Sequence, residues 1–316
     1  MNFEFKGNKF QIETLNTLNL KETYEFCENN SDDLSLSYEV FKGATIESLF
    51  FHPELSLIVR DTNKQIICFF MLVFRPSYVP KRKVGVLKFF VVEKRLRKQG
   101  LGTEIYKFLI RKIKLMPEKD IWMKLEVMSS QPDYLFPGLN PKLTSALLFL
   151  RNLGFKKYNE RINLIVDLKK LKSDKPPEKK GNVKISRATI ADKEKLMDLA
   201  FMPIRYQLIS WSEEILLSYQ NKPRSTFVAK LHDDKIIGFA THSVGFPGSF
   251  GPIGIMKKYR NNDLGKTLLN WCIWDLKRKD IDSMIIRWID ENVLSFYSKT
   301  LGAKISNIFW ALKTRI

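Results

Sequence analysis

The chain has 316 residues, of which 44% are hydrophobic, so each half is long enough to bury a core of its own. Its three cysteines and three histidines are scattered, which predicts neither a disulfide framework nor a metal site. The formal net charge of +19 predicts attraction of polyanions, although no nucleic-acid-binding motif accompanies it, and lysines spread over solvated faces remain the alternative. The longest apolar run, 66–74, is too short to cross a bilayer, and the first residues lack a signal-peptide pattern. We therefore expect a cytoplasmic protein that does not enter the membrane.

Alternating and apolar runs predict strands early in the chain. Ser56–Arg60 and Ile66–Phe70 flank a polar turn and predict a hairpin. Leu87–Val92 is a further apolar strand, which leads through the basic, glycine-containing turn Arg97–Gly102 into an amphipathic helix over Thr103–Ile113.

The stretch 171–182 is charged, contains two adjacent prolines and has no apolar periodicity, which is typical of a linker. Strand-like segments lie on either side of it, at Ile162–Leu168 and Val183–Thr189. The sequence therefore predicts one domain over 1–170 and a second over 183–316.

The second half repeats the order of the first. A hairpin is predicted from Thr226–Lys230 and Ile236–Ala240, followed by a strand over Ile253–Ile255, a turn over Arg260–Gly265 and a helix over Lys266–Leu276. The same offset of 163 positions relates both ends of the two turns, so they align without a gap. The first half carries an insertion after this point, which includes 133–140.

The turn Arg97–Gly102 has the residue types that a pyrophosphate site needs. Glycines let backbone amides approach a phosphate closely, and the helix that follows begins with its positive dipole end there. Arg97 and Lys98 add positive charge. An ordinary tight strand-to-helix turn is the alternative for this motif alone.

Four segments resemble motifs of the GNAT superfamily of N-acetyltransferases. Val92–Gly102 and Ile255–Gly265 resemble its acyl-CoA-binding motif, while Ala146–Phe155 and Phe296–Ala303 resemble its later helix and turn. The resemblance covers most of the chain and implies an α/β (α+β) protein of two tandem GNAT folds, each a mixed, centrally splayed sheet flanked by helices. It also implies an N-acetyltransferase that uses acetyl-CoA as cosubstrate and needs no metal.

The resemblance carries the coenzyme-binding role onto matching positions in both halves. In the first half these are the strand before the loop, the loop itself and the start of the helix: Phe90, Val91, Val92, Arg97, Lys98, Gln99, Gly100, Leu101, Gly102 and Thr103. In the second half they are Ile255, Arg260, Asn262 and Gly265. Asp263 stands where the family has glycine, and its charge would face an anionic pyrophosphate, so the second loop is predicted to be degenerate.

The catalytic residues are divided between the halves. Tyr297 stands where many members of the family have a tyrosine that protonates the departing thiolate, whereas the first half has Leu150 there. A core aromatic is the alternative for Tyr297. Glu126 is the candidate general base, with Glu93, Asp290 and Glu291 as further carboxylates, although each is also typical of a solvated charge and water could take the proton.

Tyr134–Leu139 and Phe250–Ile255 further resemble a tandem subgroup, and this resemblance implies a small amine, with an amino sugar as one acceptor. Two other functions stay open: acetylation of an RNA- or protein-linked amine, of which the charge favours the RNA-linked one, and a non-catalytic acyl-CoA sensor. The acyl chain length, the acceptor and the oligomeric state do not follow from the sequence.

Overall fold

The computed structural model describes residues 2–32, 36–76, 83–116, 124–172, 174–201, 209–260 and 262–315. It divides into two compact units: unit 1 comprises Met1–Glu160 and Phe309–Ile316, and unit 2 comprises Arg161–Ile308. Compared with the predicted domains, unit 1 also includes the last residues, 309–316, and unit 2 begins at Arg161. The predicted limits of the two sequence repeats, 1–170 and 183–316, stay a prediction. Among the described residues, no helix combines the length and the apolar character needed to cross a membrane.

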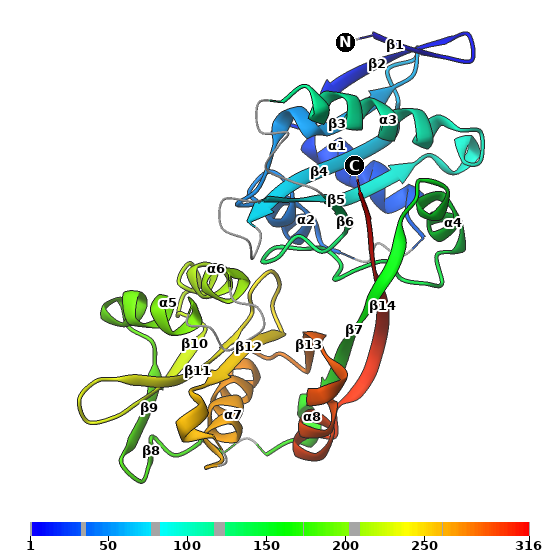
Figure 1. Ribbon diagram of the computed structural model, residues 1–316. Coiled ribbons are helices and arrows are strands. Elements are labelled where there is room, and N and C mark those ends of the chain that lie inside the picture. Colours follow the sequence, from blue (N-terminus) through cyan, green and yellow to red (C-terminus); the bar gives the residue numbers. More distant parts are fainter. Residues whose placement is uncertain are drawn as a thin grey trace. The chain divides into compact units, whose positions relative to one another are not determined.

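Unit 1 is a mixed sheet with helices on both faces (Figure 1). Its elements are β1 (Asn2–Phe5), β2 (Asn8–Thr14), α1 (Leu20–Asn30), α2 (Tyr38–Ala44), β3 (Ser56–Arg60), β4 (Ile66–Pro76), β5 (Lys83–Val92), α3 (Leu101–Lys114), β6 (Lys124–Val127), α4 (Thr144–Asn152), the start of β7 (Lys156–Asp167) and the end of β14 (Lys304–Arg315). Strands β1 to β5 pair antiparallel in sequence order, β5 pairs parallel with β6, and β6 pairs antiparallel with the end of β14.

Strands β3, β4 and β5 of unit 1 are nearly continuous apolar runs because both of their faces are covered. Alternate residues of β4 enter two different cores: Phe70 belongs to the cluster that contains α3 and α4, and Phe69 belongs to the cluster that contains α1 and α2. The predicted hairpin of β3 and β4 is confirmed, with Leu57 opposite Phe70. The predicted strand and helix around the loop are also confirmed, as β5 and α3.

Unit 2 repeats this architecture. Its elements are the end of β7, β8 (Lys179–Lys180), β9 (Val183–Arg187), α5 (Lys193–Phe201), α6 (Ile209–Ser218), β10 (Thr226–Lys230), β11 (Ile236–His242), β12 (Ser249–Ile255), α7 (Leu264–Lys277), β13 (Ser283–Ile289), α8 (Leu294–Leu301) and the start of β14. The sheet order is β8-β9-β10-β11-β12-β13-β7, and among the pairs that the described residues form in it, only β12–β13 is parallel. Helices α7 and α8 share one core, and α5 and α6 share another.

The stretch predicted to be a linker, 171–182, lies within unit 2 and contacts its helix α7. The indole of Trp271 donates to the carbonyl of Pro177 at 3.2 Å, and Nζ of Lys277 donates to the carbonyl of Leu171 at 2.6 Å. Strand β8, within the same stretch, pairs with β9. This stretch is therefore held against the second core by its backbone carbonyls.

Candidate active site

The central parallel strands of unit 1 pair over a short distance and then separate. Strand β5 pairs with β6 from Gly85 to Leu87, and the amide of Met128 donates to the carbonyl of Leu87 at 2.8 Å. Strand β6 ends at Val127, whereas β5 continues to Val92. The far end of β5 therefore has an edge that β6 does not cover.

A β-bulge marks the point of separation. Met71 lies opposite Phe89 and Leu72 lies opposite Leu87, so Lys88 is the extra residue of β5. The bulge shifts the alternation of side chains, and both Lys88 and Phe89 are buried. Unit 2 has a corresponding irregularity, because Ala240 pairs with Ile253 and His242 with Phe250.

A cavity of about 910 Å³ lies along the free end of β5. Its lining combines the end of β5 (Phe89–Val92), most of the loop and first turn of α3, the residues after α1 and the start of α4. Nine of the ten positions that the sequence predicts for the first half line it, namely Phe90, Val91, Val92, Arg97, Lys98, Gly100, Leu101, Gly102 and Thr103. Gln99 does not line it, and its side-chain amide donates to the carbonyl of Arg95 at 2.9 Å.

The geometry of the loop favours its glycines. Gly100 precedes α3 with a φ of 98°, in the left-handed region that favours glycine. A Cβ on Gly102 would lie 3.3 Å from Cγ2 of Val92 and 3.5 Å from the ring of Phe149. The loop thus brings the backbone of the first turn of α3 to the cavity, where its amides and the helix dipole favour an anion.

Arg97 fixes the loop to its surroundings. Its Nε donates to the carbonyl of Val92 at 3.1 Å, and its Nη1 donates to Oδ2 of Asp32 at 2.7 Å. Its Nη2 also donates to the carbonyl of Asn30. Lys98 is exposed at the cavity and adds a cation there.

The loop of unit 2 keeps the backbone arrangement and changes the charge. Arg260 donates from Nε to the carbonyl of Ile255 at 3.1 Å, as Arg97 does to Val92. Asp263 precedes α7 with a φ of 51°, and its exposed carboxylate lies 3.5 Å from Nζ of Lys180. Ile255, Arg260, Asn262 and Gly265 thus lie together at the start of α7, beside a carboxylate.

Glu126 lies in β6, where both of its carboxylate oxygens have partners. Oε2 accepts from Arg75 at 2.7 Å and from Ser129 at 3.0 Å, and Oε1 lies 3.0 Å from Nζ of Lys124. Glu126 is buried and is not part of the cavity lining. The contacts therefore suit a carboxylate that holds β6 in place, and its role as a base stays a prediction.

The other predicted carboxylates also lie outside the lining of the cavity. Glu93 is ion-paired with Arg95 at 2.6 Å, and Asp290 and Glu291 are exposed in unit 2.

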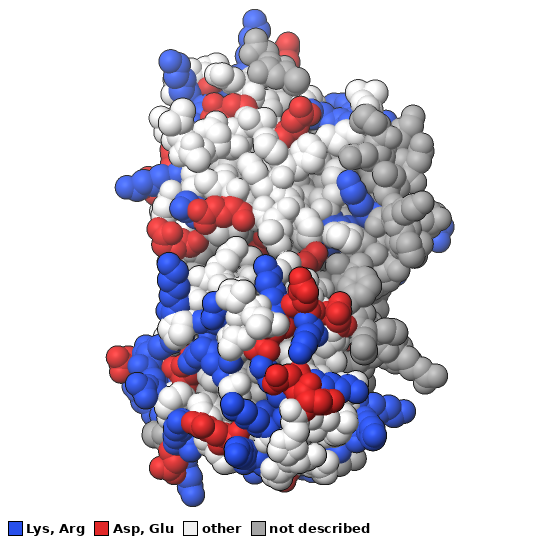
Figure 2. All heavy atoms as spheres, turned by 90° about the vertical axis from the view of Figure 1, so that its left-hand side faces the viewer, with Lys and Arg blue, Asp and Glu red and all other residues white. Residues whose placement is uncertain are grey.

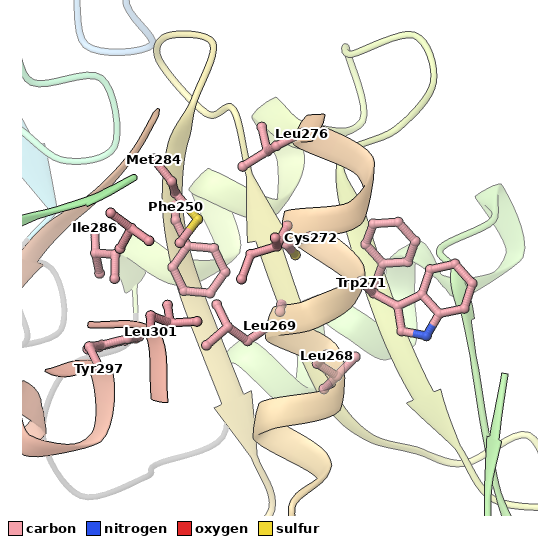
Figure 3. Packing of buried hydrophobic residues seen from close by; sticks show 14 of the residues in the cluster. Phe250, Leu268, Leu269, Trp271, Cys272, Leu276, Met284, Ile286, Tyr297 and Leu301 are labelled. Carbon is pink, nitrogen blue, oxygen red and sulfur yellow. The ribbon is translucent and has the colours of Figure 1, made fainter. Parts of the chain in front are cut away.

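Tyr297 lies in α8, within the main core of unit 2 (Figure 3). It is 5% exposed, and its ring meets that of Phe250 edge-on at 6.2 Å. Burial raises the pKa of the phenol well above its usual range. Leu150, at the equivalent position of unit 1, is fully buried in α4. The two predicted catalytic residues, Glu126 and Tyr297, thus belong to different units.

Sequence reasoning missed two buried charged clusters. In unit 1, Nζ of Lys88 binds Asp133 at 2.6 Å and Ser48 at 3.0 Å. In unit 2, Asp275 binds His242 at 3.0 Å and Lys279 at 3.1 Å, and it also pairs with Arg187. A lysine inside the apolar run 84–92 was the available signal for the first cluster. The scattered histidines gave no signal for the second cluster.

Trp211 of unit 2 packs on Phe239 with ring centres 6.0 Å apart, against the core of α5 and α6. Among the described residues, no three His, Cys, Asp or Glu side chains gather as a metal site.

Solved structures share this fold over nearly the whole chain. A glucosamine N-acetyltransferase region of a fungal multi-domain β-N-acetylglucosaminidase is 16% identical with a TM-score of 0.76, covering 97% of this chain, which spans 38% of that one. A tandem GNAT protein of the clavulanic acid biosynthesis pathway is 14% identical with a TM-score of 0.66, covering 97% of this chain and 98% of its own. An N-acetyltransferase of Sphaerobacter thermophilus is 13% identical with a TM-score of 0.65, covering 97% and 95%. At these identities the likeness shows the fold.

Sequence comparison identifies the family. No curated protein sequence matches the chain. The sequence profile described as the acetyltransferase (GNAT) family matches twice, over 18–132 and 195–303, which together make up more than half of the chain. The two matches fall on the two repeats, each with its strand, loop and helix in the order described above. The chain therefore belongs to the acetyltransferase (GNAT) family, as an N-acyltransferase with two such domains in tandem.

Proposed function

We propose that unit 1 binds acetyl-CoA in its cavity and transfers the acetyl group to the primary amine of a small molecule. The supporting observation is that one cavity is bounded both by the loop at the start of α3 and by the free edge of β5. Its volume of about 910 Å³ lies within the usual range for small-molecule sites. The similarity in fold to a glucosamine N-acetyltransferase region makes an amino sugar the first acceptor to test.

The loop end of the cavity suits the pyrophosphate. Backbone amides of Leu101, Gly102 and Thr103 have no helical partner at the start of α3 and can donate to phosphate oxygens. Lys98 supplies an exposed cation beside them. Arg97 is already bound to Val92, Asn30 and Asp32, so we assign it to holding the loop.

The other end of the cavity suits the thioester. Phe89, Met128 and Phe136 line it and would exclude water from the reacting carbonyl. A backbone amide on the free edge of β5 would polarise that carbonyl as the amine nitrogen attacks it and the carbon–sulfur bond breaks.

The proton of the attacking amine has no free carboxylate to receive it within the described lining. Asp32 lines the cavity, but it is bound to Arg97 at 2.7 Å, and Glu126 lies outside the lining. We therefore assign the removal of this proton to water, which finally delivers it to the departing thiolate.

We propose that unit 2 does not bind the coenzyme. Its loop keeps the helix start and the Arg260 contact, but Asp263 would place a carboxylate against the pyrophosphate. Under this proposal, the protein has one working site and a second repeat that serves a structural or acceptor-binding role.

Calorimetry of acetyl-CoA binding to the full chain tests the proposal. We expect one equivalent to bind the unchanged protein, none to bind Gly100→Glu, and one to bind the matched variant Gly265→Glu. Gly100→Glu places a side chain at a φ of 98° and a charge at the loop. Loss of binding in Gly265→Glu with retention in Gly100→Glu would assign the site to unit 2 instead. Thiol release with a panel of amino sugars then distinguishes an enzyme from a sensor that binds without turnover.

The net charge of +19 favours a second candidate, an amine carried by RNA. On the face drawn in Figure 2, however, Lys and Arg side chains are interspersed with Asp and Glu. Binding of transfer RNA that weakens steeply with salt, and acetylation of that RNA, would favour this candidate over the small amine.

A further inference from the structure

The last residues of the chain belong to unit 1, although they follow unit 2 in the sequence. The end of β14 pairs antiparallel with β6, with Lys313 opposite Glu126 and Arg315 opposite Lys124. Strand β6 is the parallel neighbour of β5 at the point where the cavity begins. The C-terminal strand therefore completes the sheet on the side of β6 away from β5.

The same strand also contacts a wall of the cavity through its backbone. The amide of Leu139 donates to the carbonyl of Trp310 at 3.0 Å, and the amide of Trp310 donates to the carbonyl of Leu139 at 2.8 Å. Gly138 lines the cavity next to this pair. A Cβ on Gly138 would lie 2.7 Å from the carbonyl oxygen of Trp310, and this oxygen belongs to the backbone and cannot rotate away.

Side-chain packing extends the support to a second wall. Leu312 of the C-terminal strand is buried in one cluster with Leu139 and with Leu150 of α4. The neighbours of Leu150 on the same helix, Phe149 and Ala146, line or contact the cavity. One strand thus supports both the segment around Gly138 and the helix that faces the loop of α3.

We propose that Phe309–Arg315 is a positioning element of the coenzyme site of unit 1, and that it acts through the close approach of Trp310 to Gly138. The inference rests on the proposed function, since the cavity is assigned to acyl-CoA there. It means that the site of the first repeat is incomplete until the end of the second repeat is in place. A fragment of residues 1–170 would lack this strand.

Substitution of Gly138 in the full chain is the first test, with Gly43→Ala as the matched control. Neither glycine has a positive φ, and a Cβ on Gly43 of α2 would meet nothing within 4 Å. We expect Gly138→Ala to raise the Kd for acetyl-CoA at least about tenfold, while Gly43→Ala leaves it unchanged. Unchanged affinity in Gly138→Ala would overturn the proposal.

Hydrogen exchange on the unchanged protein gives a test that no misfolded variant can obscure. Coupling between sites is reciprocal, so saturating acetyl-CoA should slow exchange of the amides of Leu139 and Trp310 more than that of amides in β3, the reference strand of the same unit. Equal protection of the two regions would overturn the proposal. If acetyl-CoA does not bind at all, the proposed function fails. Exchange at 136–143, compared between Gly138→Ala and Gly43→Ala without ligand, then still decides whether Trp310 holds this wall.

Discussion

Nζ of Lys88 lies 2.6 Å from Oδ1 of Asp133, and the lysine side chain is completely buried. Ser48 accepts a second hydrogen bond from the same ammonium, and the amide of Leu49 donates to the other oxygen of Asp133 at 3.2 Å. Burial lowers the pKa of Lys88, and the neighbouring carboxylate opposes this effect. The pair ties the bulge of β5 to the segment that follows β6, across the point where the two strands separate.

Removing one partner of this pair should destabilise unit 1 strongly. We expect Lys88→Met to lower the free energy of unfolding by about 3–5 kcal/mol, because it leaves Asp133 buried without its cation. The double variant Lys88→Met/Asp133→Leu should recover part of the loss. Urea unfolding of both variants checks this, with Lys169→Met, from an exposed pair with Asp282, as the control that should change little. A small effect in Lys88→Met would show that water or another group reaches Asp133.

Removing the charge at the second loop should create a coenzyme site. Asp263→Gly keeps the left-handed backbone and removes the carboxylate from the start of α7, so we expect the acetyl-CoA stoichiometry to rise from one towards two. Asp280→Gly is the matched control, since Asp280 also has a positive φ but follows the other end of the same helix. Calorimetry at millimolar ligand measures both variants. A stoichiometry that stays at one would mean that features other than Asp263 close the second site.

Tyr297 should behave as a core residue. Because its ring lies in the core of unit 2 and transfer is assigned to unit 1, Tyr297→Phe should leave kcat within about twofold of the unchanged protein. Tyr297→Ala should instead lower the free energy of unfolding by about 3–5 kcal/mol through the cavity that it leaves. A fall in kcat of about a hundredfold or more in Tyr297→Phe, with stability preserved, would restore the general-acid role.

The buried cluster around His242 should make the stability of unit 2 depend on pH. Burial lowers the pKa of His242 below its ordinary value of 6.5, against the opposing effect of Asp275, while Lys279 and Arg187 add to the lowering. The unfolded chain therefore binds a proton more readily than the folded one, and stability falls as the pH drops from about 6.5 through the lowered pKa. Thermal unfolding between pH 7.5 and 5 should show a smaller loss for His242→Gln than for the unchanged protein. An equal loss of stability with falling pH in the two proteins would mean that a group other than His242 titrates.

Local features of the fold could be predicted from the sequence. The hairpins of β3 with β4 and of β10 with β11, and the strand, loop and helix around Gly100 and Asp263, follow from periodicity and glycine placement over short stretches. Even the left-handed backbone at Asp263 agrees with the tolerance of aspartate for a positive φ.

Features that depend on distant residues could not be predicted in this way. The buried side chain of Lys88, at the bulge, binds Asp133 and Ser48, which are remote in sequence, and nothing in the apolar run of β5 identifies them. The pairing of β6 with β14 also cannot be predicted from the local sequence, because an alternating pattern predicts a strand but does not identify the strand with which it pairs. Burial of Tyr297 likewise follows from the surrounding core and not from its position in a motif.

The pairing of Lys124 with Arg315 also has a consequence for synthesis of the protein. The first repeat emerges from the ribosome well before β14, the strand that completes the sheet of unit 1. Contacts between such remote residues are slow to form, and during that interval the open edge of β6 is available to other chains. The cavity wall of the nascent first repeat should therefore stay unsupported until β14 has emerged from the ribosome.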